Sequence, residues 1–81
     1  MTIEVRFLAS LRSAAGRDSY TLDLPPGATL GQAIERLLRE IPDLRAHVPM
    51  WHLAVNGTYA EPDAVLQPGD RISVFPYIAG G

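Results

Sequence analysis

The start of the chain alternates apolar and polar residues, the period of two that is typical of a strand with one buried face. Ile3, Val5 and Phe7 are separated by polar or charged residues, which predicts a strand over residues 2–8 with Phe7 in the core. A second alternation predicts a strand over residues 20–24. The two strands are therefore expected to form a hairpin.

The sequence predicts one short helical segment between these two strands and a longer helix after them. Residues 9–15 favour a short helical turn that ends at Gly16, because glycine readily adopts the left-handed conformation of a helix end. Thr29 and Gln32 match a capping box, which predicts a helix start. Apolar residues then recur with helical spacing until Pro42, so an amphipathic helix is expected there. Its apolar stripe comprises Leu30, Ala33, Ile34, Leu37, Leu38 and Ile41.

The remainder of the chain reads as short strands joined by turns. Asn56-Gly57 is the dipeptide that best tolerates the positive φ angles of a type I′ hairpin turn. The expected elements are a connector over 43–50, strands over 51–55 and 58–60, a turn over 67–70 and a last strand over 71–75.

The order of these elements predicts an α+β fold in which one main helix packs against a mixed sheet. A ubiquitin-like β-grasp is the natural arrangement. A ferredoxin-like fold would need a second long amphipathic helix, and the residues from Glu61 onward do not supply one. We expect a single domain over residues 1–81, with a flexible carboxyl-terminal tail over residues 76–81.

Composition narrows the range of functions. The 81 residues are 47% hydrophobic and 20% charged, as in folded domains, and they include no cysteine, which excludes thiolate chemistry within the chain and suits a reducing cytoplasm. The seven basic residues are all arginines spread between acids, so nucleic acid is not an expected partner. The sequence shows neither a membrane-length apolar run nor the apolar core of a secretion signal, so we expect a cytoplasmic location and no membrane partner.

No internal cluster of residues predicts catalysis. His47 and His52 lack a third ligand and a metal-binding spacing, so neither is expected to hold a metal. Glu61 and Asp63 flank a proline in an expected turn, where carboxylates commonly cap backbone N–H groups. Residues 27–31 have too few glycines for a phosphate loop, and no lysine follows them.

The carboxyl end is the strongest candidate site. Two terminal glycines follow an apolar segment, a pattern that suits an arm threading into a partner. Activation of the terminal carboxylate as an acyl-adenylate would let a sulfur donor convert Gly81 into a thiocarboxylate, with Gly80 as the threading residue. The expected partner interface is Phe75, Pro76, Tyr77 and Ile78, although a strand phenylalanine such as Phe75 is as often a core residue.

Several segments resemble the MoaD/ThiS family of sulfur carriers, most closely its molybdopterin synthase small subunits. The resemblance covers nearly the whole chain and implies the β-grasp fold. The segments that carry it are residues 5–12, Ala15-Gly16, residues 55–57, residues 66–72, Phe75-Pro76 and Gly80-Gly81.

The resemblance also implies the partners. A ubiquitin-activating-type adenylating enzyme would use ATP and magnesium to activate Gly81, and a sulfurtransferase route would deliver the sulfur. The tail would then enter the large subunit of molybdopterin synthase, where the sulfur builds the dithiolene of molybdopterin. The chain would bind no cofactor itself and would not be a catalyst alone.

Other readings stay open. The Ile78-Ala79-Gly80-Gly81 ending is also similar to carriers of thiamin thiazole synthesis, and Pro76-Tyr77 departs from the Pro-Pro of many synthase subunits. Phe7 and Leu11-Arg12 favour molybdopterin. Thiolation of tRNA or of metabolites, a protein modifier that forms isopeptide bonds, and a plain interaction module are the remaining alternatives.

Overall fold

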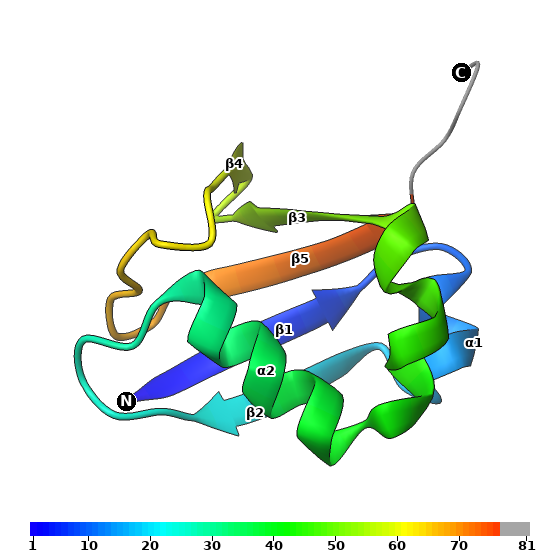
Figure 1. Cartoon of the computed structure of the whole chain (residues 1–81), viewed down its shortest axis with the longest axis horizontal. Helices are drawn as coiled ribbons and strands as arrows, with labels where there is room; N and C mark the ends of the chain where they lie inside the picture. The colour runs from blue at the N-terminus through cyan, green and yellow to red at the C-terminus, as the bar shows by residue number, and fades with distance from the viewer. Residues whose placement is uncertain (77–81) are drawn as a thin grey trace.

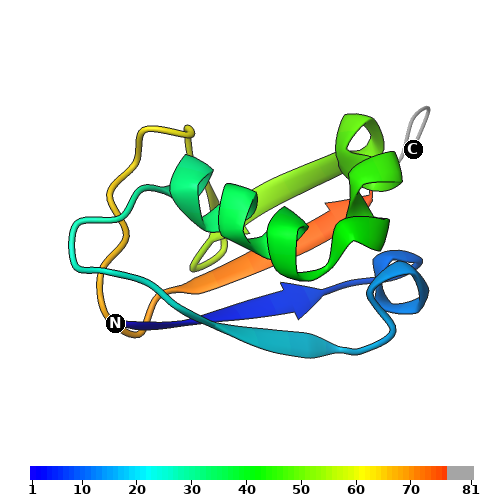
Figure 2. The same ribbon diagram turned by 60° about the horizontal axis from the view of Figure 1, so that its bottom comes forward.

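Five strands form one mixed sheet, and the main helix crosses one of its faces (Figures 1 and 2). The strands are β1 (Thr2–Phe7), β2 (Ser19–Asp23), β3 (Trp51–Val55), β4 (Thr58–Tyr59) and β5 (Arg71–Pro76), and the helices are α1 (Leu11–Ala15), α2 (Leu30–Glu40) and the 3₁₀ helix η1 (Pro42–Met50). The strand order is β2-β1-β5-β3-β4, with β1 and β5 parallel and the other neighbours antiparallel. The computed structural model describes residues 1–76. The predicted α+β β-grasp is confirmed.

The β1–β2 hairpin forms as predicted, with Ile3 opposite Leu22. Its connection differs in one detail, because α1 begins at Leu11 rather than at Ala9. Ala9 has φ 52°, a left-handed conformation that a right-handed helix cannot include. Gly16 ends α1 with φ 74°, as its sequence position indicates.

The capping box predicted for α2 is present. The Thr29 hydroxyl accepts a hydrogen bond from the Gln32 amide at 3.2 Å, and the Gln32 side chain accepts one from the Thr29 amide at 2.9 Å. Ile41 ends the helix with φ −128° and ψ 78°, outside the helical region that the residue before a proline avoids. Leu30, Ala33 and Leu37 on the apolar stripe are fully buried.

Replacing Thr29 with alanine removes the side-chain acceptor of this cap. We expect the free energy of unfolding to fall by about 0.5–2 kcal/mol, which urea denaturation will measure. Thr58→Ala is the control, because Thr58 is exposed and caps no helix. A loss at Thr29 no larger than the loss at Thr58 would contradict this role of the cap.

Residues 43–50 are not the plain connector expected from the sequence. They form the 3₁₀ helix η1, which starts with Pro42 in its first turn and packs against α1 and α2. Leu44 is fully buried and joins the core cluster. Packing against α1 and α2, with Leu44 in the core and Val48 against it, holds the segment in place rather than a local period.

The last strand runs one residue further than predicted, so the expectation that a tail begins at Pro76 is wrong. Pro76 pairs with Trp51 of β3 and closes β5. The Val74 carbonyl accepts a hydrogen bond from the Leu8 amide on the β1 side, and the Pro76 nitrogen, two residues on, faces the same side. Because β1 has ended there, the missing N–H of Pro76 removes no ladder hydrogen bond.

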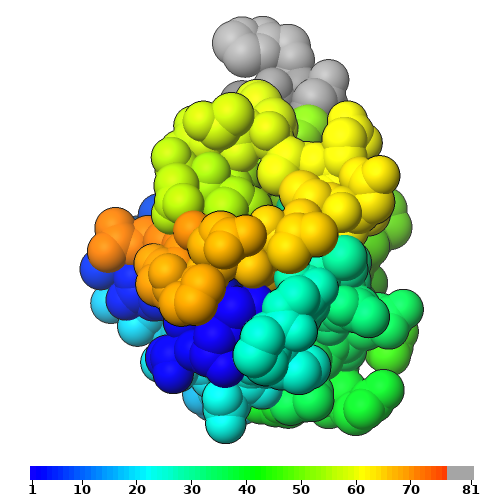
Figure 3. Space-filling view, turned by 90° about the vertical axis from the view of Figure 1, so that its left-hand side faces the viewer, coloured from blue at the N-terminus to red at the C-terminus, as the bar shows by residue number. Residues whose placement is uncertain are grey.

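The core lies between the helices and the inner face of the sheet. Phe7 is buried there, as predicted, together with Ile3 and Val5. Figure 3 views the end of the molecule at which the first residues of β1 lie between the loop before β5 and the loop before α2. Hydrogen bonds fix this arrangement, since the Leu24 amide donates to Met1 and the Leu66 amide donates to Ala28.

Candidate docking face and carrier terminus

Strand β5 divides its side chains between the two faces of the sheet. Ile72 and Val74 point into the core and are fully buried, whereas Ser73 and Phe75 lie on the outer face, which the helices leave uncovered. Phe75 is only partly buried and is not one of the buried core residues. Phe75 is therefore not a core residue and lies on the outer side of the sheet, and its role in an interface stays a prediction.

Phe75 belongs to an aromatic patch that also contains His52 and Tyr59. The His52 and Phe75 rings are stacked with centroids 5.7 Å apart, and the Tyr59 ring lies 5.9 Å from His52 and 6.1 Å from Phe75. Tyr59 is 69% exposed, and Leu8, which follows β1, is also exposed. The patch is an apolar surface beside the residue at which β5 ends.

Only part of the predicted site lies within the described residues. Phe75 and Pro76 are the last two residues of β5. The predicted threading residue Gly80, the predicted chemical site Gly81, and the interface residues Tyr77 and Ile78 lie outside the described residues.

A polar cluster on the outer face was not anticipated from the sequence. Arg71 donates from Nε to Glu4 Oε1 at 2.6 Å, and Arg6 Nε lies 3.5 Å from the same oxygen. The hydrogen bond from Arg71 holds the pKa of Glu4 below its usual value. Arg71 and Glu4 lie far apart in the sequence, and only the parallel β1–β5 register brings them together.

The turns beside this cluster are joined by side-chain hydrogen bonds. Asn56 Nδ2 donates to Asp70 Oδ1 at 2.9 Å, and Asn56 Oδ1 accepts from the Arg71 amide at 2.9 Å. Asp70 Oδ2 in turn accepts from the Gln67 amide at 2.7 Å. Asn56 and Gly57 have positive φ angles, as the predicted hairpin turn requires.

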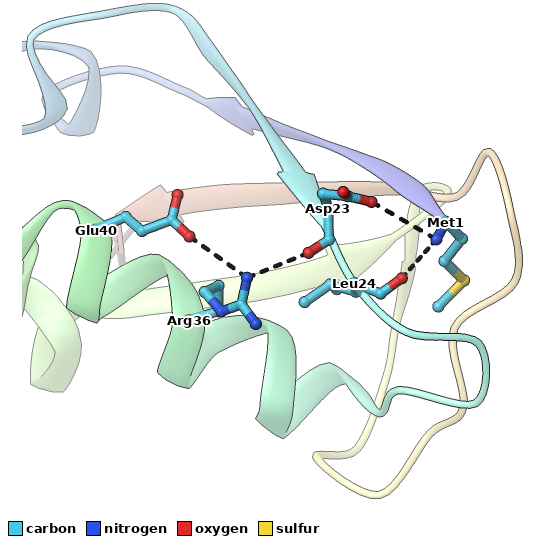
Figure 4. A network of polar contacts seen from close by, with 5 residues as sticks. All are labelled: Met1, Asp23, Leu24, Arg36 and Glu40. Atoms are coloured by element: carbon cyan, nitrogen blue, oxygen red, sulfur yellow. Dashed lines mark hydrogen bonds and ion pairs between the residues drawn. The ribbon is translucent and has the colours of Figure 1, made fainter.

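A second polar network ties the beginning of the chain to α2 (Figure 4). The Met1 ammonium donates to the Leu24 carbonyl and lies 3.8 Å from Asp23 Oδ1. Arg36 donates to the Asp23 carbonyl at 3.2 Å and pairs with Glu40 at 3.7 Å. These contacts hold the outer edge of β2 against the helix.

Tyr20 extends the same network along β2. Its hydroxyl donates to Glu40 Oε1, and this hydrogen bond raises the pKa of Tyr20. The Arg17 guanidinium lies 5.0 Å from the centre of the Tyr20 ring. The side chains of Arg17, Tyr20, Arg36 and Glu40 are at least partly exposed, so the network serves to anchor β2 rather than to form an enclosed site.

The remaining segments considered in the sequence are the two histidines, the Glu61–Asp63 turn and the glycines of residues 27–31. Within residues 1–76, no three His, Asp or Glu side chains are grouped so that they could hold a metal ion. Glu61 and Asp63 lie exposed in a turn. Gly31 allows a close backbone approach, because its amide donates to the Pro62 carbonyl at 2.9 Å and a Cβ there would lie 3.2 Å from that oxygen. No helix among the described residues is long and apolar enough to cross a membrane.

Comparisons with known proteins agree with this geometry. The model of the ThiS family matches residues 5–81. A molybdopterin synthase sulfur carrier subunit from Arabidopsis thaliana is 30% identical over 79 residues, which cover 98% of this chain and 82% of that protein.

Solved structures share the fold of this chain. The crystal structure of SAMP1 from Haloferax volcanii has a TM-score of 0.91 at 26% identity, with 100% of both chains covered. A chain from the complex of subunits 1 and 2 of molybdopterin-converting factor from Helicobacter pylori has a TM-score of 0.75 at 23% identity, again with 100% of both covered. A family match that begins inside β1 and continues to residue 81, on a β-grasp sheet, shows that this chain belongs to the MoaD/ThiS family of ubiquitin-like sulfur carriers.

Proposed function

We propose that this chain carries sulfur on its carboxyl-terminal glycine and delivers it as the small subunit of a molybdopterin synthase. The observation that carries the proposal is the family match, which extends through Gly80-Gly81, combined with the similarity to a molybdopterin synthase sulfur carrier subunit. The chain is a protein-bound cosubstrate in this proposal. A partner supplies the catalytic groups.

Activation proceeds at the carboxylate of Gly81. A carboxylate oxygen attacks the α-phosphorus of ATP on a magnesium-dependent adenylating enzyme, and pyrophosphate leaves. A sulfur atom at the oxidation level of hydrosulfide, supplied through a sulfurtransferase, then attacks the carbonyl carbon, and AMP leaves with the electron pair of the broken C–O bond. The product is a thiocarboxylate, an anionic sulfur nucleophile. Glycine suits this position because the absence of a Cβ leaves the carbonyl open to attack.

The aromatic patch is the surface we assign to the receiving partner. Phe75 and Tyr59 present apolar area on the face of the sheet that the helices do not cover, beside the residue at which β5 ends. Aromatic side chains at such sites commonly supply much of the binding energy of an interface. The Helicobacter pylori relative, which shares the fold, comes from a complex of two converting-factor subunits. We therefore assign the large synthase subunit as the partner.

Intact-mass analysis of the chain from its native host tests the proposal. We expect a species in which one terminal oxygen is replaced by sulfur. A chain extended by one residue after Gly81 is the control, because its terminal carboxylate is displaced, and it should carry no sulfur and support no transfer. Full function of the extended chain would instead support a plain interaction module.

A protein modifier is the second candidate, and the similarity to a small archaeal modifier protein favours it. Both functions begin with an adenylate, but they differ in the product. The modifier would accumulate as covalent adducts on lysine side chains of other proteins. The same mass analysis, performed on whole-cell protein, therefore separates the two functions.

A further inference from the structure

Three charged side chains lie together on the outer face of the sheet, on β1 and at the start of β5. The parallel register of β1 and β5 sets Glu4 beside Arg71, and Arg6 follows two residues later on the same face of β1. Glu4 Oε1 accepts from Arg71 Nε at 2.6 Å and lies 3.5 Å from Arg6 Nε. One carboxylate thus lies between two guanidinium groups.

Arg6, Arg71 and Glu4 together carry a net positive charge, because two guanidinium groups share one carboxylate. Each guanidinium contacts Glu4 through Nε, and no contact within residues 1–76 engages the terminal nitrogens of Arg6 or Arg71. The side chains of Arg71 and Arg6 are 55% and 47% exposed, so these N–H donors are open to a binding partner. Arg6, Arg71 and Glu4 carry a net charge of +1 in a chain whose formal net charge is -2. The neighbouring Asp70 carboxylate accepts hydrogen bonds from Asn56 Nδ2 and the Gln67 amide, not from either guanidinium.

A polar hollow of about 450 Å³ adjoins Arg71. It is lined by Asn56, Gly57, Gly69, Arg71 and Ser73. The hydrogen bonds between Asn56, Asp70 and the Arg71 amide fix its wall, so the strand position of Arg71 is set before any partner arrives. The hollow gives a partner side chain room to approach Arg71.

The arginine pair is continuous with the aromatic patch. Arg71, Ser73 and Phe75 lie on the same face of β5, and four residues of strand place Arg71 about 13 Å from Phe75 along the sheet. This span is well within one interface of ordinary size. A protein seated on the aromatic patch therefore also reaches the arginine pair.

We propose that Arg6 and Arg71 form a second anchor for the partner that receives the tail, and that they bind an aspartate or glutamate carboxylate on it. This inference rests on the proposed function, in which that partner is the large synthase subunit. Glu4 acts as a positioning residue, because it contacts both guanidinium groups through Nε and neither of them through a terminal nitrogen. A guanidinium fork matches a carboxylate through two parallel hydrogen bonds, which a point charge cannot do.

Arg71→Gln tests the anchor, with Arg39→Gln as the matched control. Both changes remove one positive charge from an exposed side chain, but Arg39 lies on α2, on the opposite side of the sheet. Titration calorimetry with the purified large subunit from the same organism will give the dissociation constants at low and at physiological salt. We expect Arg71→Gln to weaken binding by about fivefold or more, and Arg39→Gln to change it by less than about twofold.

Two further measurements separate an anchor from a structural effect. Arg71→Lys keeps the charge but not the fork, so binding should fall between the wild type and Arg71→Gln. The wild-type complex should weaken more steeply with added salt than the Arg71→Gln complex does, because one charged contact is missing from the latter. Circular dichroism of each variant should show an unchanged fold, since all these side chains are exposed.

The outcomes distinguish this inference from the function on which it rests. Equal effects of Arg71→Gln and Arg39→Gln would overturn the anchor while leaving the sulfur-carrier proposal intact. Saturable binding of inorganic phosphate at Arg71 in the free chain, together with a complex that tolerates Arg71→Gln, would show a free-anion site and also overturn it. A wild-type chain that carries terminal sulfur but does not bind the large subunit would overturn both the synthase assignment and the anchor.

Discussion

Leu37→Ala is expected to lower the free energy of unfolding by about 2–5 kcal/mol. Leu37 lies in α2 and is fully buried in the core cluster. The substitution removes buried methyl groups and leaves a cavity that the surrounding strands can only partly fill, and both effects destabilise the folded state. Urea denaturation followed by circular dichroism measures the change directly.

The same substitution at an exposed position is the matched control. Leu8 is 44% exposed, so Leu8→Ala should cost less than about 1 kcal/mol. Sulfur transfer by Leu37→Ala should fall only in proportion to the unfolded fraction, because Leu37 is on the far side of the sheet from the outer face. If a fully folded Leu37→Ala chain lost sulfur transfer, Leu37 would have a role in transfer besides its role in the core, which would contradict this prediction.

The sequence predicts best where several local signals coincide. For α2, the Thr29 cap, the helical spacing of leucines and the stop at Pro42 all agree, and the helix forms between these limits. Strands β1, β2 and β5 follow from their alternation in the same way, whereas β3 and β4 follow from the Asn56-Gly57 turn between them. The 3₁₀ helix η1 has no such period, because it is held by tertiary contact with α1 and α2, which includes the burial of Leu44. A short run of sequence cannot reveal that contact.

In the candidate site too, some features have a local sequence signal and others depend on tertiary contacts. Phe75 shares its alternation with the polar residues Arg71 and Ser73, and this parity already indicates the outer face on which the structure places it. The Glu4–Arg71 contact has no local signal, because it requires the parallel pairing of the first and last strands. Alternation reveals the face of a strand, whereas the identity of its neighbours requires the fold.

Deletion of Gly81 is expected to abolish sulfur transfer and to leave the melting temperature unchanged. Within residues 1–76, every buried core residue lies between Ile3 and Val74. Terminal residues seldom add to the stability of a domain, so we expect the core to be unaffected by the deletion. The shortened chain still ends in a glycine carboxylate, that of Gly80, but its reacting carbon lies up to about 3.5 Å short of the original position. A displacement of this size prevents attack in an active site that positions the reacting atoms. Single-turnover sulfur transfer to the pterin precursor, with the large subunit in excess, measures the loss.

Binding and chemistry should separate in this variant. The aromatic patch and the arginine pair are unchanged by deletion of Gly81, so we expect the shortened chain to bind the large subunit through these surfaces and to compete with the intact chain for it. Arg71→Gln should show the reverse, with weaker binding and an unchanged rate of transfer once the complex is saturated. If the chain lacking Gly81 still transferred sulfur, the reacting carbonyl would not be that of Gly81. The length of the tail would then not determine where its terminus reacts.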